Sequence, residues 1–595
     1  MDKTNNIYIT TPIYYINDKP HIGHTYSTFT ADILARFYRL LWFNTYFVTW
    51  TDENSQKTVE AAKSKLEILK KFWRNSDEKE NLWRKSEENL KNYEDIKKLY
   101  QFIKEKELEK LLEDYLNWKL KDIPLELVQA YTDYMASIWR KTWENLKISF
   151  NDFIRTTEKR HKKAVEKFYL KAKQNWYVYK WKYKGLYCWK CEAFYKESDL
   201  IKDEKTGKLL CPIHKYPVEE IEEENYFFKL TAFEKEVEKY LNENHIFPEF
   251  RKKELINNFL KEGLEDFSIS REWKKWWIPF PDDPNHVFYV WYDALTNYLS
   301  VLWYAENKDL FEKFWDNWFI IHIIWKDIIK FHAIYWPAML WAANEKAPDL
   351  IAAHWFFTIN WEKISKSLGN AIPPTDLTDK YWIDAVRYYL FKDLKFWNDG
   401  DFSFERLHDL YNTNLLGWWW NLVSRVTKLA HKNNINQITK DELIEVKNYL
   451  SNQLNNFDFS ENNRLKDLIT EWFNKEIILY YLQNFDFQWY LNHWYELIQF
   501  ANKLIDQEKP WEKLKNEETK NEWIFILKTL LYLIRQLAIL VAPILIESFE
   551  KIKDILGEEI LTKIDTTSKI ENIEKIFDLE ELKFNLHPWY LYKKL

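Results

Sequence analysis

The sequence predicts an α/β fold with a parallel sheet, followed by an all-helical domain. Near the N-terminus, β-branched and aromatic runs at Ile7–Thr10 and Tyr46–Thr49 flank a helical run at His24–Leu41. This strand–helix–strand order is typical of a parallel sheet. Much later, Phe319–Ile324 is an almost continuous apolar run, as expected of a parallel strand that is buried on both faces. Beyond Ser403 helical sequence dominates, which predicts a helix bundle.

Length and composition describe a soluble globular protein of several domains. The 595 residues are 46% hydrophobic and 30% charged, with a net charge of −6, so a nucleic-acid partner would have to meet a local basic patch. The N-terminus enters a strand without a secretory signal, and the most apolar tract, Leu530–Ile546, is broken by Arg535 and Pro543 as in a buried helix. Three cysteines give no disulfide framework. We therefore expect a cytoplasmic protein that binds no membrane.

Tryptophan and glycine occur in abnormal numbers. The chain has 33 Trp and only 8 Gly, whereas Gly alone ordinarily makes up about 7% of residues. Several Trp stand where turns favour Gly, such as Trp361 after Asn360 and Trp397 before Asn398. We hypothesise that most of them represent UGA codons that the source organism reads as glycine. The alternative is a protein that is truly rich in Trp.

The first strand leads into His21-Ile22-Gly23-His24. A turn with Pro20 precedes this motif, and a helix that begins at or near His21 would direct its N–H groups and the positive end of its dipole at a phosphate. The two imidazoles share one helix face, and Gly23 lets a charged ligand approach the backbone. By itself, such a pair is as often a packing feature as a binding site.

Residues 66–122 interrupt the strand–helix alternation. They are rich in Lys, Glu and Leu, and the stretch 105–112 is typical of them. We expect a solvated helical insertion; a partner-binding surface is the alternative. Strand and helix signals resume at Phe150–Ala172.

All three cysteines belong to two short motifs. Cys188 and Cys191 are separated by two residues, and Cys211 and His214 repeat this spacing further along the chain. Three thiolates and one imidazole complete a tetrahedral zinc site without an open coordination position. The zinc is therefore expected to be structural and to stabilise a small module. Unrelated free thiols are the alternative, and a catalytic cysteine is not expected.

A Ser-rich loop, Lys363-Ile364-Ser365-Lys366-Ser367, ends at Gly369. Two lysines three residues apart can hold a polyphosphate while the loop remains mobile, although such a loop alone is usually a surface turn. The helices expected after it are Leu416–Leu429, Leu465–Gln483, Leu491–Ile505 and Trp523–Ile546.

The order of these motifs resembles that of a known family. His21–His24 after the first strand and Lys363–Ser367 more than 300 residues later resemble the paired signature of class I aminoacyl-tRNA synthetases. Within that class, the sequence resembles the methionyl-tRNA synthetases over nearly the whole chain outside 66–122. The segments that carry this resemblance are Thr10–Tyr15, Thr51–Glu53, Asp152–Thr157, Gly185–Cys188, Tyr289–Leu295, Lys326–Asp327, Phe331–Ala333, Lys363–Asn370, Asp384–Tyr389 and Lys509–Trp511.

The resemblance implies a Rossmann-like class I synthetase catalytic domain with a zinc-knuckle insertion, followed by an α-helical anticodon-binding bundle. The expected regions are 1–175 (first catalytic half, with the insertion at 66–122), 176–240 (zinc-knuckle insertion), 241–345 (second catalytic half), 346–405 (stem-contact region with the Lys loop) and 406–595 (bundle). The sequence stops at Leu595 without the extra domain that makes some relatives dimers, so a monomer is expected.

The implied reaction is the ATP-dependent ligation of L-methionine to tRNA(Met) through a methionyl-adenylate. His21 and His24 would stabilise the phosphates in the transition state, and Lys363 and Lys366 the leaving pyrophosphate, which also binds Mg²⁺. The residues implied to bind ATP are these four together with Gly23, Lys326 and Asp327.

The resemblance also assigns the other binding residues. Asp52 would hold the substrate ammonium group, and aromatic edges around the sulfur atom suit a thioether. The residues implied to line the pocket are Ile13, Tyr15, Trp291, Ala294, Leu295, Tyr298 and His332. In the bundle, Asn421 and Arg425 share a helix face and would contact the anticodon, on which Trp511 would stack for ~1–3 kcal/mol.

The sequence departs from the family pattern in a consistent way. The positions where the family expects Gly, or at 50 another small residue, are Trp42, Trp50, Trp277, Trp325, Trp355, Trp361, Trp382 and Trp420. The positions where it expects Trp are Trp276, Trp291, Trp336 and Trp511. Asn54 and Ser55 replace a family His-Gly, and Ile364 replaces a Met.

Two alternatives stay open at this point. Indoles at Trp325 and Trp361 would crowd the ATP site, which favours a non-catalytic tRNA-binding homologue; methionine-dependent ATP–pyrophosphate exchange would separate the two readings. A class I synthetase for another amino acid is the second. The leucine, isoleucine and valine enzymes carry a large editing insertion, and the cysteine enzyme uses an active-site zinc, neither of which fits this chain.

Overall fold

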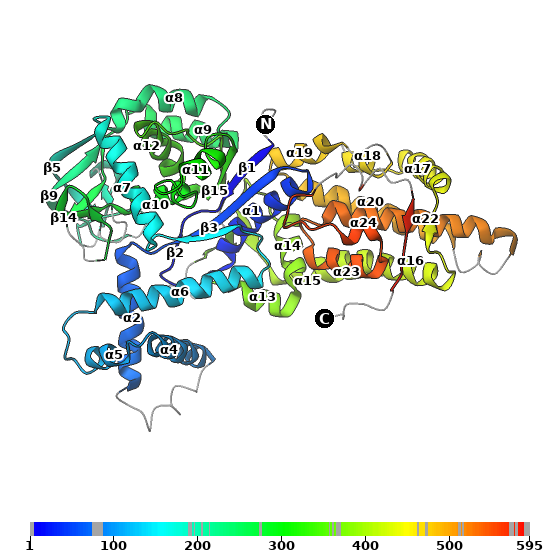
Figure 1. Cartoon of the computed structure of the whole chain (residues 1–595), viewed down its shortest axis with the longest axis horizontal. Helices are drawn as coiled ribbons and strands as arrows, with labels where there is room; N and C mark the ends of the chain where they lie inside the picture. The colour runs from blue at the N-terminus through cyan, green and yellow to red at the C-terminus, as the bar shows by residue number, and fades with distance from the viewer. Residues whose placement is uncertain are drawn as a thin grey trace.

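The computed structural model describes residues 5–73, 87–188, 193–195, 197–203, 206–212, 215–272, 276–355, 357–359, 362–364, 371–460, 463–470, 474–509, 513, 517–570, 576 and 581–587. Figure 1 shows an elongated molecule with a sheet and its helices at one end and a helix bundle at the other. The first strand and first helix lie where the two parts meet.

A seven-stranded parallel sheet forms the centre of the first part. Its order is β10-β16-β15-β1-β3-β2, and β4 also pairs with β3. The strands are β1 (Asn6–Thr10), β2 (Tyr14–Tyr15), β3 (Asn44–Asp52), β4 (Asp152–Arg155), β10 (Ile246–Phe247), β15 (Phe319–Trp325) and β16 (Leu350–His354). Thr10 lies opposite His322 on one side and Val48 on the other. The predicted parallel sheet is confirmed, and segments 300 residues apart end at its same edge.

Side-chain alternation along β1 divides the core into two faces. Ile7 and Ile9 pack in one hydrophobic cluster, whereas Tyr8 packs in another with Phe168 and Tyr292. Burial on both faces explains why these strands have almost continuous apolar sequence. The helices of this part include α1 (Ile22–Leu40), α7 (Lys159–Gln174), α8 (Glu234–Asn242), α9 (Glu249–Leu255), α10 (Val290–Ser300), α11 (Lys308–Phe314) and α12 (Trp336–Ala342).

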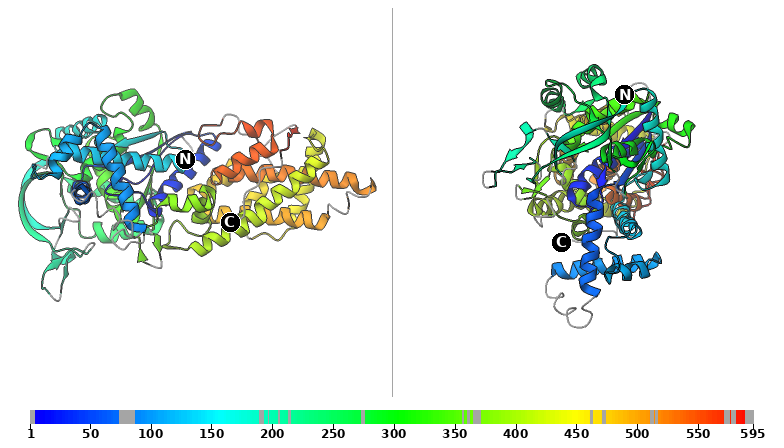
Figure 2. Two further views of the ribbon diagram at one scale, coloured as in Figure 1. Left: turned by 90° about the horizontal axis from the view of Figure 1, so that it is seen from below. Right: turned by 90° about the vertical axis from the view of Figure 1, so that its left-hand side faces the viewer.

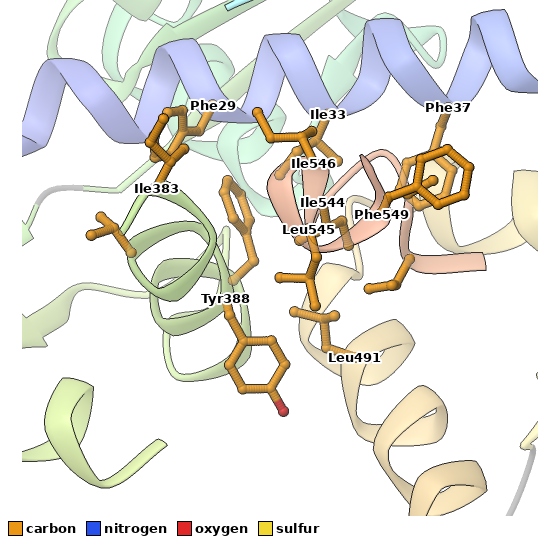
Figure 3. Packing of buried hydrophobic residues seen from close by; sticks show 14 of the residues in the cluster. Phe29, Ile33, Phe37, Ile383, Tyr388, Leu491, Ile544, Leu545, Ile546 and Phe549 are labelled. Atoms are coloured by element: carbon orange, nitrogen blue, oxygen red, sulfur yellow. The ribbon is translucent and has the colours of Figure 1, made fainter. Parts of the chain in front are cut away.

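Helix α1 joins the two parts of the molecule. Figure 3 shows Phe29, Ile33 and Phe37 packed against side chains that come from the bundle. Leu491 of α20 (Phe487–Glu508) and Phe549 of α23 (Ile546–Leu556) belong to the same cluster. The helix that begins at the sheet edge therefore has its flank buried in the bundle.

The stretch 66–122 is largely helical where the structure describes it. Its helices, with their neighbours, are α2 (Gln56–Trp73), α4 (Glu87–Glu105), α5 (Glu109–Leu116) and α6 (Leu125–Asn145). Figures 1 and 2 show that α2, α4 and α5 project from the body, and that α6 returns to it.

A four-stranded antiparallel sheet of order β11-β9-β5-β6 is separate from the parallel one. Its long strands are joined by exposed cross-strand ion pairs, such as Lys182–Glu222 and Lys184–Glu220. The remaining strands of this part are β5 (Val178–Cys188), β6 (Ala193–Tyr195), β7 (Ile201–Lys202), β8 (Leu209–Leu210), β9 (Glu219–Phe228), β11 (Phe267–Ser268), β12 (Ser270–Glu272), β13 (Pro279–Phe280), β14 (Asp283–Phe288), β17 (Phe357–Ile359), β18 (Glu362–Lys363) and β19 (Gly400–Phe402).

The C-terminal part is the predicted helical region. The expected run Leu465–Gln483 is split, because α19 begins anew at Lys475 with the Asn474 side chain as its N-cap. The elements are α13 (Pro374–Tyr381), α14 (Ile383–Lys392), α15 (Phe404–Leu410), α16 (Asn421–Lys432), α17 (Lys440–Asn455), α18 (Asp467–Thr470), α19 (Lys475–Gln483), α22 (Glu517–Val541), α24 (Glu559–Thr562), β20 (Gln437–Ile438) and β21 (Leu582–Lys583).

One helix in the described part, α22, is long and apolar enough to cross a membrane. However, 83% of its most apolar window is buried inside the protein. It packs as a core helix, as the sequence predicted for this tract.

Candidate active site

His21 and His24 lie at the N-terminus of α1, at the edge where the parallel strands end. His21 is the N-cap, and its Nδ1 accepts a hydrogen bond of 3.1 Å from the Gly23 N–H. The His24 Nδ1 in turn accepts one of 3.1 Å from the His21 N–H. The rings stack with centroids 3.8 Å apart. Because both Nδ1 atoms accept, each neutral imidazole carries its proton on Nε2, where it is a donor.

Gly23 lets the His21 ring lie close to the helix backbone. A Cβ at this position would lie 3.0 Å from the Cε1 atom of His21. Any side chain would therefore displace the first imidazole.

The segment that follows the Lys loop contacts the helix of the His motif. Lys363 belongs to β18, which pairs with β17 at Thr358, whereas Lys366 lies outside the described residues. The chain that leaves the loop returns to α1, because the Ile22 N–H donates a 2.9 Å hydrogen bond to the Ile372 carbonyl. Ile372, which follows the Lys loop, thus contacts the N-terminus of the helix that carries His21 and His24.

Lys326 and Asp327 follow β15 directly. Lys326 Nζ lies 3.4 Å from an Asp399 carboxylate oxygen and 3.6 Å from the centroid of the Trp355 ring. Asp327 is exposed. At the end of the same strand, Trp325 packs against Tyr14 and His24, with ring centroids 5.8 and 5.9 Å away.

Tyr298 and His332, two of the predicted pocket residues, form a buried hydrogen-bonded pair. The Tyr298 hydroxyl donates to His332 Nε2 at 2.7 Å, and the opposite nitrogen of His332 donates to the Ile328 carbonyl at 2.9 Å. Burial lowers the pKa of His332 to about 4 and raises the pKa of Tyr298 well above its ordinary value. Both groups are therefore neutral at physiological pH, which suits an apolar thioether.

The other pocket residues differ in exposure. Ile13, Ala294 and Leu295 are buried. Trp291 and Tyr15 are partly exposed, and the Trp291 ring stacks on Phe331 at 3.6 Å.

A buried polar network holds Asp52. Its Oδ1 accepts from the Asn54 N–H at 3.1 Å, and the Asn54 amide donates to Asp293 at 2.8 Å. Asp293 also binds the His161 imidazole at 2.5 Å. Arg155 clamps the neighbouring carboxylate of Glu53 with bonds of 2.6 and 2.9 Å. Asn54, which departs from the family pattern, thus has a defined structural role.

Comparison with known proteins shows the family to which the chain belongs. The family model "tRNA synthetases class I (M)" matches residues 7–106 and 121–427. The chain is 33% identical over 574 residues to the methionine–tRNA ligase of Fusobacterium nucleatum, which covers 96% of this chain and 77% of the relative. The chain belongs to the class I tRNA synthetases of the methionyl type.

Two further members of the family are similar over nearly their whole length. The methionine–tRNA ligase of Rickettsia conorii is 34% identical over 563 residues, with 93% of each chain covered. Among solved structures, the methionyl-tRNA synthetase of Mycobacterium tuberculosis in complex with methionyl-adenylate has a TM-score of 0.76 at 28% identity, and the match covers 98% of both chains. The Rossmann-like class I synthetase core and the helical C-terminal region are therefore those of the family.

Two of the four predicted zinc ligands can be placed. Cys188 ends β5 and is buried, as is Cys211. The turn after Cys211 closes with a 2.9 Å bond from the Cys211 N–H to the Tyr216 carbonyl. Cys191 and His214 lie outside the described residues. Within those residues, no group of three or more His, Cys, Asp or Glu could hold a metal ion.

The expected anticodon residues lie on α16. Asn421 is exposed at its first turn, and Arg425 binds Asp506 of α20 at 2.9 Å. Trp511 lies outside the described residues.

The buried residues that support the candidate site were not predicted from the sequence. Thr10 and Trp336 bond to opposite nitrogens of buried His322, at 2.8 and 3.3 Å. The His161–Asp293 pair was also not predicted. Asp293 lies in a segment that carries the family resemblance, which was the available signal.

Proposed function

We propose that this chain catalyses the ATP-dependent ligation of L-methionine to tRNA(Met) through a methionyl-adenylate. The observation that carries the proposal is the Ile22–Ile372 hydrogen bond, which joins the helix of the first signature motif to the segment that follows the second. Family membership and the neutral pocket around Tyr298 support methionine as the amino acid.

In the first step, a methionine carboxylate oxygen attacks the α-phosphorus of ATP, and the bond to pyrophosphate breaks. His21 and His24 donate from Nε2 to phosphate oxygens as charge builds on them. Lys363 and Lys366 neutralise the departing pyrophosphate, to which Mg²⁺ contributes further positive charge. Gly23, Lys326 and Asp327 complete the proposed ATP site. In the second step, a hydroxyl of the terminal ribose of the tRNA attacks the adenylate carbonyl, and AMP leaves.

The proposed methionine site combines one charge with an apolar cavity. Asp52 accepts the substrate ammonium group, and its orientation is supported by the Asn54–Asp293 contact. Tyr15, Trp291, Tyr298 and His332 present ring edges to the sulfur atom, with Ile13, Ala294 and Leu295 behind them. Because Tyr298 and His332 are neutral and already hydrogen-bonded to each other, amino acids with a charged side chain should be rejected.

Two further sites belong to the proposal. Cys188, Cys191, Cys211 and His214 would hold a structural zinc ion, which is supported by their spacing and by the burial of both described cysteines. Asn421, Arg425 and Trp511 would contact the anticodon. The proposed domain boundaries are those expected from the sequence, at 175, 240, 345 and 405.

The test is ATP–pyrophosphate exchange with protein translated in its own organism. Exchange is expected with methionine and not with leucine, isoleucine or valine. His24→Gln should lower it about 10²–10³-fold, because one phosphate donor is lost, whereas His431→Gln on the exposed face of α16 should not. No exchange with any amino acid would favour the alternative, a tRNA-binding homologue without catalysis.

A further inference from the structure

Two indoles of the written sequence lie where the proposed substrates must bind. Trp50 is fully buried, 4.5 Å from the Tyr298 ring, and donates a 2.7 Å hydrogen bond to the Pro12 carbonyl. Trp325 packs on Tyr14 and His24. The first occupies the methionine pocket and the second the surface on which ATP would lie. This part of the argument rests on the proposed function.

Backbone geometry gives an independent observation. Of the twelve non-glycine residues with positive φ in the described part of the chain, five are Trp: Trp42, Trp118, Trp176, Trp303 and Trp382. Trp makes up 33 of 595 residues, so fewer than one would be expected by chance. A positive φ brings the Cβ atom of an L-residue close to its own carbonyl, and only glycine avoids this contact.

Three of these Trp occupy the helix-terminating position that glycine favours most. Trp42, Trp118 and Trp176 each follow the C-cap of a helix. The hydrogen bond that closes such an end spans each of them, from 43 to 38, 119 to 114 and 177 to 172, at 2.8, 3.0 and 3.1 Å. This is the Schellman arrangement, in which the residue inside the turn is usually glycine. Their rings are exposed, that of Trp176 by 82%, so they contribute little to the core.

Trp382 has an even more restrictive conformation. Its φ of 74° and ψ of 158° place it between α13 and α14. This region of the Ramachandran plot is essentially restricted to glycine. Trp303 has φ of 61° after α10.

A second set of Trp residues has the surroundings expected of a genuine tryptophan. Their rings are buried or partly buried, and each indole N–H donates to a defined acceptor. Trp50 shares both features, so its assignment below rests on its place in the proposed methionine pocket and not on this contrast. The members are Trp139 to Asp18 at 2.9 Å, Trp276 to Glu53 at 2.7 Å, Trp315 to Lys346 at 3.0 Å, Trp336 to His322 at 3.3 Å and Trp494 to Leu537 at 2.9 Å. By contrast, the buried N–H groups of Trp277 and Trp355, two positions where the family expects Gly, have no partner.

We infer that positions 42, 50, 118, 176, 303, 325 and 382 are glycine in the protein that its own ribosomes make. The codons there are UGA, read as glycine, whereas the second set is encoded by UGG. Glycine at 50 makes room for the thioether beside Tyr298. Glycine at 325 uncovers the His24 ring for the nucleotide.

Peptide mass spectrometry of protein from the source organism tests the identities directly, and the coding DNA gives the codons. The expected result is glycine at the seven positions and Trp at 139, 276, 315, 336 and 494. Trp at any of the seven overturns the assignment at that position, and Trp at all seven overturns the inference. Glycine at the control positions would also contradict it, because the control positions have neither a positive φ nor a place in the proposed substrate sites.

Recombinant protein tests the consequence for the site. We compare the chain as written, the double variant Trp50→Gly/Trp325→Gly, and a variant with all seven changes, which protects against poor folding of the double variant. All variants also carry Trp361→Gly, because an indole at that position would crowd the ATP site as well. The variant with all seven changes should exchange pyrophosphate more than about tenfold faster than the chain as written. Equal rates would contradict the assigned roles of positions 50 and 325. Trp291→Gly, added to the seven changes, should raise the methionine KM.

If mass spectrometry finds glycine and no variant exchanges, the proposed function fails while the inference stands. If mass spectrometry finds Trp at the seven positions and the native protein exchanges pyrophosphate, the inference fails while the proposed function stands.

Discussion

At the scale of single residues, the site depends on a glycine that the written sequence retains. Gly23→Ala would place a Cβ 3.0 Å from the His21 ring, so the imidazole must move by a few tenths of an ångström or more. In the natively translated enzyme we expect kcat for ATP–pyrophosphate exchange to fall about 10–100-fold, because catalysis is sensitive to such displacement. The methionine KM should change little, since the pocket is not touched. A raised methionine KM with unchanged kcat would contradict the role of this turn.

The buried His332 predicts a pH dependence of stability. Its folded pKa is about 4, against an ordinary value of 6.5, because burial disfavours the charged form. Between these values the unfolded chain takes up a proton and the folded chain does not, so stability falls as the pH is lowered from 6.5 to 4. The loss at pH 5 should be about 2 kcal/mol, measured from urea unfolding at pH 7.5 and 5.

The control for this prediction is His332→Gln, which cannot take up a proton. Its stability should fall less between the two pH values than that of the unchanged chain. His354, whose pKa burial also lowers to about 4, contributes a similar slope to both proteins. An identical slope in the two would show that His332 is not a source of the effect.

At the scale of elements, most of the strained backbone conformations of the written sequence lie at the ends of helices. Trp176 follows α7 with φ of 63° and an exposed ring. Trp176→Gly should raise the free energy of unfolding by about 1–2 kcal/mol, since a left-handed conformation costs an L-residue that much. Trp494→Gly, which removes a buried ring, should instead lower it by about 3–5 kcal/mol. Denaturant unfolding measures both, and stabilisation of the two alike would refute the distinction.

Elements that depend on local pattern were the ones that sequence could predict. The continuous apolar run Phe319–Ile324 predicts a strand that is buried on both faces, and the structure has β15 there. The split between α18 and α19 was missed because helical composition continues across it. The Asn54–Asp293–His161 network could not be foreseen either, since Asp293 lies 239 and 132 residues from its partners. Such contacts are set by the order of strands in the sheet.

At the scale of the whole molecule, α1 carries both the catalytic histidines and the contact with the bundle. Asp32, halfway along it, is fully buried between Arg36 and Arg387 at 2.9 and 2.8 Å. Burial alone would raise the Asp32 pKa, but the two guanidinium groups and Ser149 lower it to about 2. Arg387 also donates to the carbonyls of Pro543 and Ile544, so this one carboxylate ties the α1 helix to the chain before α23.

Asp32→Asn should therefore destabilise the whole chain, and not only the sheet domain. The substitution leaves Arg387 buried without its counter-charge, which costs about 3–5 kcal/mol. The matched control is Asp506→Asn, because that carboxylate pairs with Arg425 at 2.9 Å but is 62% exposed, where an ion pair contributes about 0–1 kcal/mol. Urea unfolding followed by fluorescence measures both. Since α1 is shared, exchange activity and bundle structure should be lost together in Asp32→Asn. Loss of activity at low urea with an intact bundle would show that the two parts unfold independently.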